Sequence, residues 1–117
     1  MYSPEVIEHF EHPRNIGELP EATASAQVEN PACGDIMELS LLVRDGNIVS
    51  ARYRTRGCVA AIASGSVLTE LLQGVTVERA RSLGAQDIVK VLGKLNPEQN
   101  HATHLAVDVL RAVLGKL

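Results

Sequence analysis

The chain has 117 residues and a mass of 12.6 kDa, the size of one ordinary domain. Hydrophobic residues make up 45% and charged residues 21%, which predicts a buried core and excludes general disorder. Eleven Lys and Arg against fourteen Asp and Glu give a net charge of −3, which argues against a basic nucleic-acid-binding face. We expect a single domain over residues 1–117 with no nucleic-acid partner.

The N-terminal segment predicts neither secretion nor membrane insertion. Glu5, Glu8 and Glu11 interrupt any apolar run there, so we expect no signal peptide. The chain also lacks the run of about 18 apolar residues that a membrane-spanning helix requires. Because it has two cysteines and no export signal, we expect reduced thiols and a cytoplasmic location.

A short helix is predicted near the N-terminus. Ser3 is a favourable N-cap residue and Pro4 fits the first helical position. His12 precedes Pro13 and therefore leaves helical geometry, which ends the helix. We expect His9 and His12 to be surface or capping residues. The apolar face of this helix is expected to comprise Val6, Ile7 and Phe10.

Three strands are predicted next, over residues 24–30, 36–44 and 48–55. Asp45-Gly46-Asn47 is a hairpin signal, so the last two strands are expected to pair antiparallel. Their inward side chains are expected to be Met37, Leu39, Leu41 and Val43, and then Val49, Ala51 and Tyr53. The opposite face, either solvated or docking a partner, is expected to carry Arg52, Arg54 and Arg56.

The remainder of the chain is predicted to be helical. Residues 59–73 carry one charge and end before Gly74, which is typical of a buried helix, and small residues at 64–66 indicate a close neighbour. Two short helices are expected over 76–81 and 85–92. A last helix is expected from about Asn100 to Leu114, although Asn96-Pro97-Glu98-Gln99 is an alternative start. This order predicts an α+β fold, with about five helices on one side of a three-stranded antiparallel sheet.

Both cysteines lie where predicted strands begin or end. Cys33 and Asp35 flank Gly34, whose conformational freedom lets the thiol and the carboxylate converge. Cys58 follows Gly57 at the start of the buried helix, where the helix dipole is expected to lower the pKa of its thiol. Buried, unreactive cysteines are the alternative.

Two histidines lie three residues apart in the last predicted helix. His104 can hydrogen-bond Asp108 one turn further on, whereas His101 has no such local partner. Were Cys33, Asp35, Cys58 and His101 to meet, two sulfurs, an imidazole and a carboxylate would form a tetrahedral set for zinc or iron. Their spacing matches no compact cysteine metal motif, so the residues alone leave this open.

Several segments nevertheless form a specific combination. They are Tyr2-Ser3-Pro4-Glu5-Val6-Ile7, Pro13-Arg14-Asn15-Ile16-Gly17, Pro31-Ala32-Cys33-Gly34-Asp35, Gly57-Cys58 with Ala61-Ile62-Ala63-Ser64, and His101. With these, the chain resembles the iron–sulfur cluster assembly scaffolds of the IscU/NifU type over almost its whole length. The resemblance implies a non-enzymatic scaffold that builds a cluster from iron and from sulfur supplied by a cysteine desulfurase. It also implies transfer of the cluster to acceptor apoproteins, and zinc as a substitute occupant when iron is absent.

The resemblance assigns roles to four positions. Cys33 and Cys58 match the first two cysteine ligands of the family, and Asp35 matches the aspartate associated with cluster lability. His101 matches the histidine beside the third cysteine. That third cysteine is Ala102 in this chain, and His104 is a candidate nitrogen ligand in its place.

A second departure concerns a chaperone partner. Residues 95–99 are Leu-Asn-Pro-Glu-Gln, where many relatives carry Leu-Pro-Pro-Val-Lys for an Hsp70-type chaperone, so that partner is not supported. Three functions stay open: a scaffold or carrier, a zinc-binding regulatory or structural domain that has lost cluster assembly, and a thiol redox enzyme. In the last of these, Cys58 would be the nucleophile and Cys33 the resolving thiol.

Overall fold

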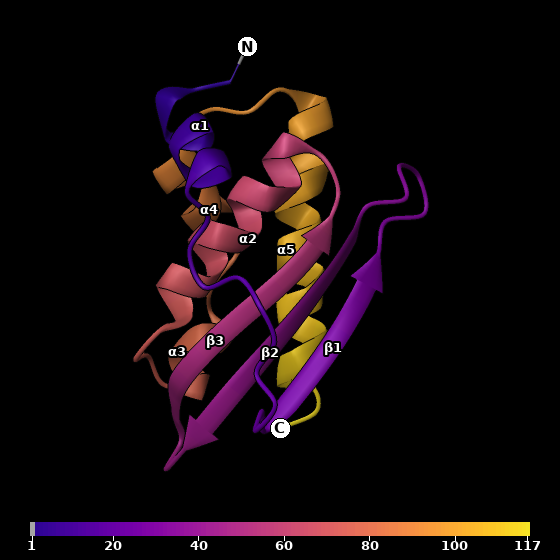
Figure 1. Cartoon of the computed structure of the whole chain (residues 1–117). Coiled ribbons are helices and arrows are strands. Elements are labelled where there is room, and N and C mark those ends of the chain that lie inside the picture. Colours follow the sequence, from indigo (N-terminus) through magenta and orange to yellow (C-terminus); the bar gives the residue numbers. More distant parts are fainter. Residues whose placement is uncertain (1) are drawn as a thin grey trace.

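The computed structural model describes residues 2–117, apart from the side chain of Glu98 (Figure 1). Three strands lie between one N-terminal helix and four later helices, in an α+β arrangement, so the predicted fold class is confirmed. In chain order the elements are α1 (Pro4–Glu11), β1 (Ala24–Glu29), β2 (Ile36–Arg44), β3 (Asn47–Arg56), α2 (Val59–Leu72), α3 (Val77–Arg81), α4 (Ala85–Leu92) and α5 (Pro97–Leu114).

The sheet has the strand order β1-β2-β3, with both pairings antiparallel. Helix α5 packs on β1 and β2 and α2 packs on β3, so these two helices cover one face of the sheet (Figure 1). The predicted arginines on the other face, Arg52, Arg54 and Arg56, are exposed. Arg54 pairs with Glu18 and Glu38, each at 2.8 Å, which is typical of a solvated surface.

A β-bulge in the hairpin corrects the predicted inward face of β3. Ala51 and Tyr53 are fully buried as expected, but Val49 is 47% exposed and Ile48 is fully buried. The register changes because Leu42 pairs with Ser50 whereas the next residue of β2 pairs with Ile48. Val49 is therefore an extra residue in β3, and the alternation that holds from Ala51 onward does not extend to it.

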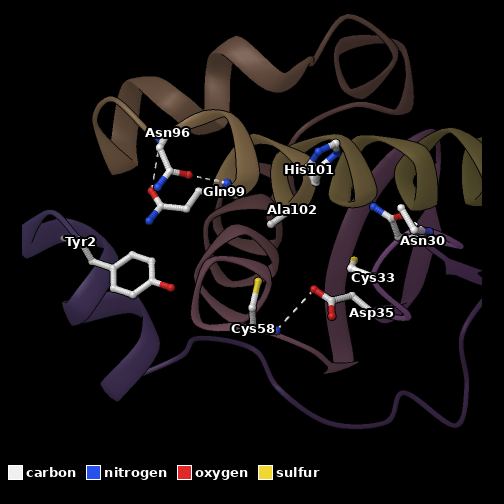
Figure 2. A pocket seen from close by; sticks show the side chains of 10 residues that line it. Tyr2, Asn30, Cys33, Asp35, Cys58, Asn96, Gln99, His101 and Ala102 are labelled. Carbon is white, nitrogen blue, oxygen red and sulfur yellow. Dashed lines mark hydrogen bonds between the residues drawn. The ribbon is translucent and has the colours of Figure 1, made fainter.

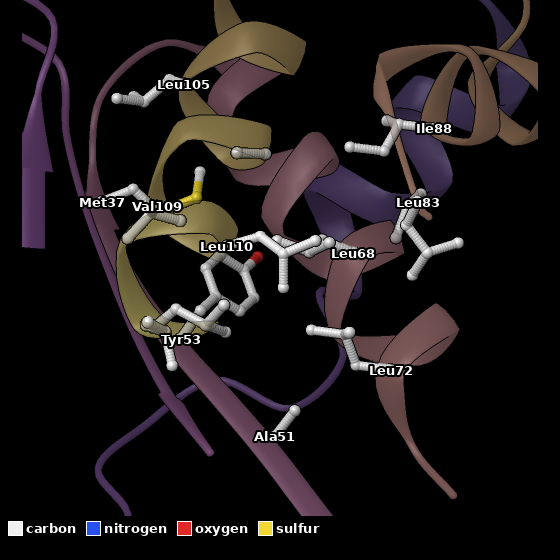
Figure 3. Close-up of a cluster of buried hydrophobic side chains, with 14 of the residues drawn as sticks. Met37, Ala51, Tyr53, Leu68, Leu72, Leu83, Ile88, Leu105, Val109 and Leu110 are labelled. Atoms are coloured by element: carbon white, nitrogen blue, oxygen red, sulfur yellow. The ribbon is translucent and has the colours of Figure 1, made fainter. Parts of the chain in front are cut away.

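Tyr53 of β3 makes a close contact with α2 in the core. Tyr53 is fully buried, and its hydroxyl donates a 2.6 Å hydrogen bond to the carbonyl of Ile62 (Figure 3). A Cβ on Gly65 would lie 2.3 Å from the Tyr53 ring, so only glycine allows this approach. The close neighbour predicted for residues 64–66 is this aromatic ring.

Helix α1 packs through a different face from the one predicted. Ser3 caps it as expected, but Ile7 and Phe10 are 43% and 39% exposed, whereas His9 is only 6% exposed. The His9 Nδ1 atom lies 2.8 Å from the Ser66 hydroxyl of α2. The prediction that His9 lies on the surface is therefore wrong, because its ring serves as the polar contact between the two helices. Burial, reinforced by the Arg14 charge, lowers the pKa of His9.

Helix α5 begins earlier than residue 100. Asn96 accepts a 2.8 Å hydrogen bond from the backbone of Gln99, and Gln99 accepts a 3.2 Å bond from the Asn96 backbone. This reciprocal cap, the alternative that the sequence left open, starts the helix at Pro97. His101 consequently lies in the second turn of α5.

Across residues 2–117, none of the helices has the length and apolar character needed to cross a membrane.

Candidate metal centre

The four predicted ligand residues line one pocket of about 580 Å³ at one end of the molecule (Figure 2). Three segments distant in sequence meet there: the β1–β2 loop, the junction of β3 with α2, and the start of α5 (Figure 1). The remaining lining residues are uncharged. The full set is Tyr2, Asn30, Ala32, Cys33, Asp35, Cys58, Asn96, Gln99, His101 and Ala102.

The β1–β2 loop presents Cys33 and Asp35. Asn30 closes this loop, because its backbone N–H bonds the carbonyl of Asp35 at 2.8 Å and its own carbonyl accepts the N–H of Gly34 at 2.7 Å. Gly34 has a φ of +76°, which a side chain would strain. The turn leaves the Cys33 thiol free and exposed, and Asp35 half-buried beside the pocket.

Cys58 is the N-cap residue of α2 and its thiol is also free. Its backbone N–H donates a 3.4 Å hydrogen bond to Oδ2 of Asp35, so these two residues face each other across the pocket floor (Figure 2). This contact joins the loop before β2 to the turn after β3.

The expected lowering of the pKa of the Cys58 thiol is wrong. Partial burial raises that pKa, and the neighbouring Asp35 carboxylate acts in the same direction. Backbone N–H groups of Ala61 and Ala60 at the helix start oppose the rise but do not outweigh it. Without a lowered thiol pKa, the thiol redox enzyme loses the feature on which that hypothesis depended.

Helix α5 forms the opposite wall of the pocket. His101 is exposed on this helix and lies across the pocket from Cys58 and Asp35 (Figure 2). Ala102, next to it, is only 3% exposed and packs with Ala60 and Ala61 of α2. The position where the resemblance places a third cysteine therefore contributes a buried methyl group to the wall.

The ligand residues surround the pocket but do not converge on a single point. Among the side chains that the structure describes, which exclude Glu98, no three of His, Cys, Asp or Glu are close enough together to hold a metal ion. His104 does not line this pocket. It borders a separate one of about 250 Å³ with Glu29 and Asp108, and His101 lines both pockets.

The whole chain, residues 1–117, matches the family model described as the NifU-like N-terminal domain. The chain belongs to this family.

Two curated relatives and one solved structure illustrate the similarity. Iron-sulfur cluster assembly scaffold protein IscU 1 of Archaeoglobus fulgidus is 39% identical, over 97% of the NifU-like domain and 74% of that protein. Iron-sulfur cluster assembly enzyme IscU of Drosophila melanogaster is 41% identical, over 98% of the chain and 77% of that protein. The N-terminal structure of a nitrogen-fixing NifU-like protein from Brucella abortus superposes with a TM-score of 0.78 at 20% identity. The superposed region covers 97% of this chain and 92% of the Brucella abortus chain, and the similarity supports the fold.

Sequence reasoning missed the other residues around the pocket of the NifU-like domain. Tyr2 belongs to a segment that carries the family resemblance, but nothing in that segment assigns it to a pocket, and Asn30 carries no local pattern that distinguishes it from ordinary surface residues. Asn96 and Gln99 were recognisable as a helix cap, but their place at the pocket follows from the early start of α5. Only the meeting of distant segments identifies these residues.

Proposed function

We propose that this NifU-like domain is a scaffold that assembles an iron–sulfur cluster and passes it to acceptor apoproteins. Cys33 and Cys58 would supply thiolate ligands, while Asp35 and His101 complete the coordination. The sulfur would come from a cysteine desulfurase. The observation that supports this most directly is that these four side chains, from three distant segments, line one pocket.

The similarity to named proteins supports the same function. The relatives from Archaeoglobus fulgidus and Drosophila melanogaster, both named for iron–sulfur cluster assembly, share about two-fifths of their aligned residues with this chain. One carries the name scaffold and the other the name enzyme. We propose the scaffold function, because four candidate ligand side chains from three distant segments line one pocket.

The spread of the ligands favours a cluster over a single zinc ion. A tetrahedral zinc site needs four donors about 2.0–2.3 Å from one ion, so the donors must lie close together. Among the residues that the structure describes, no three donors are that close. A two-iron cluster needs only two external ligands at each iron, and histidine replaces cysteine in some clusters. Donors placed around a cavity therefore suit an iron–sulfur cluster, which is larger than a zinc ion.

The mixed ligand set favours transfer over storage. Thiolates are soft ligands that suit iron–sulfur clusters, whereas a carboxylate oxygen is a harder donor. Asp35 is thus the ligand expected to release first when an acceptor competes for the cluster. Both cysteines are exposed, so acceptor thiols can reach the irons they hold.

Anaerobic reconstitution tests the proposed function. The protein is incubated with iron(II), cysteine, a cysteine desulfurase and dithiothreitol, which reduces the persulfide sulfur to sulfide. It is then separated by gel filtration and assayed for absorbance, iron and acid-labile sulfide. We expect a visible chromophore with iron and sulfide in equal amounts, and its transfer to an apo-ferredoxin. Cys33→Ala should abolish the chromophore, because one thiolate is lost from an exposed turn outside the core.

The competing functions give different results in this reconstitution and in a separate treatment with mild peroxide. A colourless protein with one tightly held zinc would establish a zinc domain and contradict the scaffold function. Rapid formation of one disulfide per chain on mild peroxide treatment, without any chromophore, would establish the thiol enzyme. A matched control is Cys33→Ser, which keeps the size of the side chain and removes the sulfur.

A further inference from the structure

The Asp35 carboxylate occupies space that is open only because residue 57 has no side chain. A Cβ built on Gly57 would lie 2.8 Å from Cγ and 2.9 Å from Oδ2 of Asp35. Both distances are shorter than the contacts that real Cβ atoms make, so the carboxylate occupies the space that any other residue at 57 would fill.

The backbone conformation does not explain the glycine. Gly57 is absent from the glycines of positive φ, which are Gly17, Gly34, Gly46, Gly74 and Gly93. An alanine can therefore adopt the backbone of Gly57 without the strain that it would meet at those positions. The requirement for glycine comes from the neighbouring atoms, and the nearest of them belong to Asp35.

The open space at Gly57 allows the carboxylate to point toward Cys58. In this position, Oδ2 of Asp35 accepts a 3.4 Å hydrogen bond from the Cys58 N–H, next to the exposed thiol (Figure 2). We infer that Gly57 is a positioning residue that keeps the Asp35 carboxylate beside Cys58, where it can share the metal with that thiol. This inference rests on the proposed function, because it gives Asp35 a metal to bind.

Substitution of Gly57 should disturb the carboxylate and leave the fold intact. The atoms at 2.8 and 2.9 Å belong to the end of a half-buried side chain, which can rotate toward solvent. The next contact, 3.1 Å to Cβ of Ala61, needs a shift of only a few tenths of an ångström. Gly57→Ala is thus expected to fold, with Asp35 turned away from Cys58.

The test is a double-mutant cycle with iron(II) alone as the probe, measured anaerobically by competition with a chromogenic chelator. We expect Gly57→Ala and Asp35→Ala each to weaken iron(II) binding about 10- to 100-fold, the range found when a ligand loses its support. In the double variant, the Gly57→Ala change should have no further effect, because no carboxylate remains to displace. Additive losses would overturn the inference and assign the effect to Cys58 or to the fold.

A second readout does not depend on metal. The backbone amide of Cys58 is followed by ¹H–¹⁵N NMR in the metal-free protein, where loss of its hydrogen bond to Asp35 shifts the amide proton upfield. Asp35→Ala should shift this amide proton in the wild-type and Gly115→Ala backgrounds, and should leave it unchanged in the Gly57→Ala background, where the carboxylate has already turned away. Gly115 is a matched control with a φ of −66° and a nearest contact of 3.4 Å, at the end of α5.

The outcomes separate this inference from the proposed function. Wild-type protein that binds iron(II) while Gly57→Ala binds it equally well overturns the positioning role alone. Wild-type protein that binds no iron(II) overturns the proposed function and the metal-binding part of this inference. A Cys58 amide that responds to Asp35→Ala as strongly in the Gly57→Ala background as in the wild type overturns the positioning role whatever the metal result.

Discussion

At the scale of single residues, Ala102 limits the number of thiolate ligands that the site can offer. The chain has two cysteines, and the methyl group of Ala102 is buried against Ala60 and Ala61 where the resemblance places a third thiol. Because Ala102 also lines the pocket, a sulfur added to its Cβ has space to point into it.

Ala102→Cys is therefore expected to lengthen the lifetime of a reconstituted cluster in air by severalfold, since a thiolate can replace a weaker oxygen or nitrogen ligand. The measurement is the decay of the visible absorbance. The control is Ala106→Cys, one turn further along α5 and fully buried in the main core, which should not alter the decay. An unchanged lifetime in Ala102→Cys would show that position 102 does not reach the cargo.

His101 and its neighbour His104 allow a matched comparison. Both are exposed histidines of α5, but only His101 lines the pocket that holds the two thiols. We expect His101→Ala to lower the iron content after reconstitution by more than half, with thermal stability unchanged within about 0.5 kcal/mol. His104→Ala should retain the full iron content. Equal losses in both variants would contradict the assignment of His101.

His9 predicts a pH dependence of stability. Burial lowers its pKa in the folded protein below 6.5, so the unfolded chain binds a proton more readily. The stabilisation is complete above pH 6.5 and is lost as the pH falls toward the folded-state value, with a slope of up to about 1.4 kcal/mol per pH unit. Urea unfolding between pH 7.5 and 5 measures this loss.

His9→Gln should remove that component of the slope, whereas His12→Gln, a change at an exposed histidine, should keep it. The charged groups that act on His9 are Arg14, Glu70 and Glu8, and they are present in both variants. If His9→Gln retains the wild-type slope, buried His9 does not control the acid sensitivity.

At the scale of elements, the start of α5 connects the fold with the site. The reciprocal cap between Asn96 and Gln99 fixes the first turn of the helix, and His101 and Ala102 follow directly. Both capping residues also line the pocket. The two residues that cap α5 therefore also form part of the pocket wall.

Asn96→Ala is expected to lower the free energy of unfolding by about 1 kcal/mol and to weaken iron(II) binding, since the turn that carries His101 loses its cap. Chemical denaturation and chelator competition measure the two effects. Asn100→Ala makes the same chemical change inside the same helix and should leave both values near those of the wild type. Weaker binding without any loss of stability would contradict the proposed link.

Local sequence patterns were sufficient to predict most elements, because caps, turns and periodicity are local. The Asp45-Gly46-Asn47 turn and the Ser3 cap are examples. Local patterns could not predict the extra residue at Val49, which depends on the pairing with β2, or the burial of His9, which depends on its contact with Ser66 of α2. In the same way, the pKa direction of Cys58 depends on burial and on Asp35 from another segment.

At the scale of the whole molecule, the site lies beside the core. The domain is elongated, 42 × 25 × 23 Å. The β1–β2 loop, the β3–α2 junction and the start of α5, whose residues line the pocket, lie at the end opposite the β2–β3 hairpin and the C-terminus (Figure 1). The buried residues of the pocket wall, Ala60, Ala61 and Ala102, form a cluster separate from the main core. Ligand substitutions should therefore change cargo binding without unfolding the domain.

The central claim is that two thiols from distant turns hold one iron–sulfur cargo. The most direct measurement is the iron and acid-labile sulfide content per chain of anaerobically reconstituted wild type, Cys33→Ala and Cys58→Ala. The account predicts equal iron and sulfide in the wild type and almost none in either variant, with all three proteins folded. A full complement of iron and sulfide in either cysteine variant would contradict it.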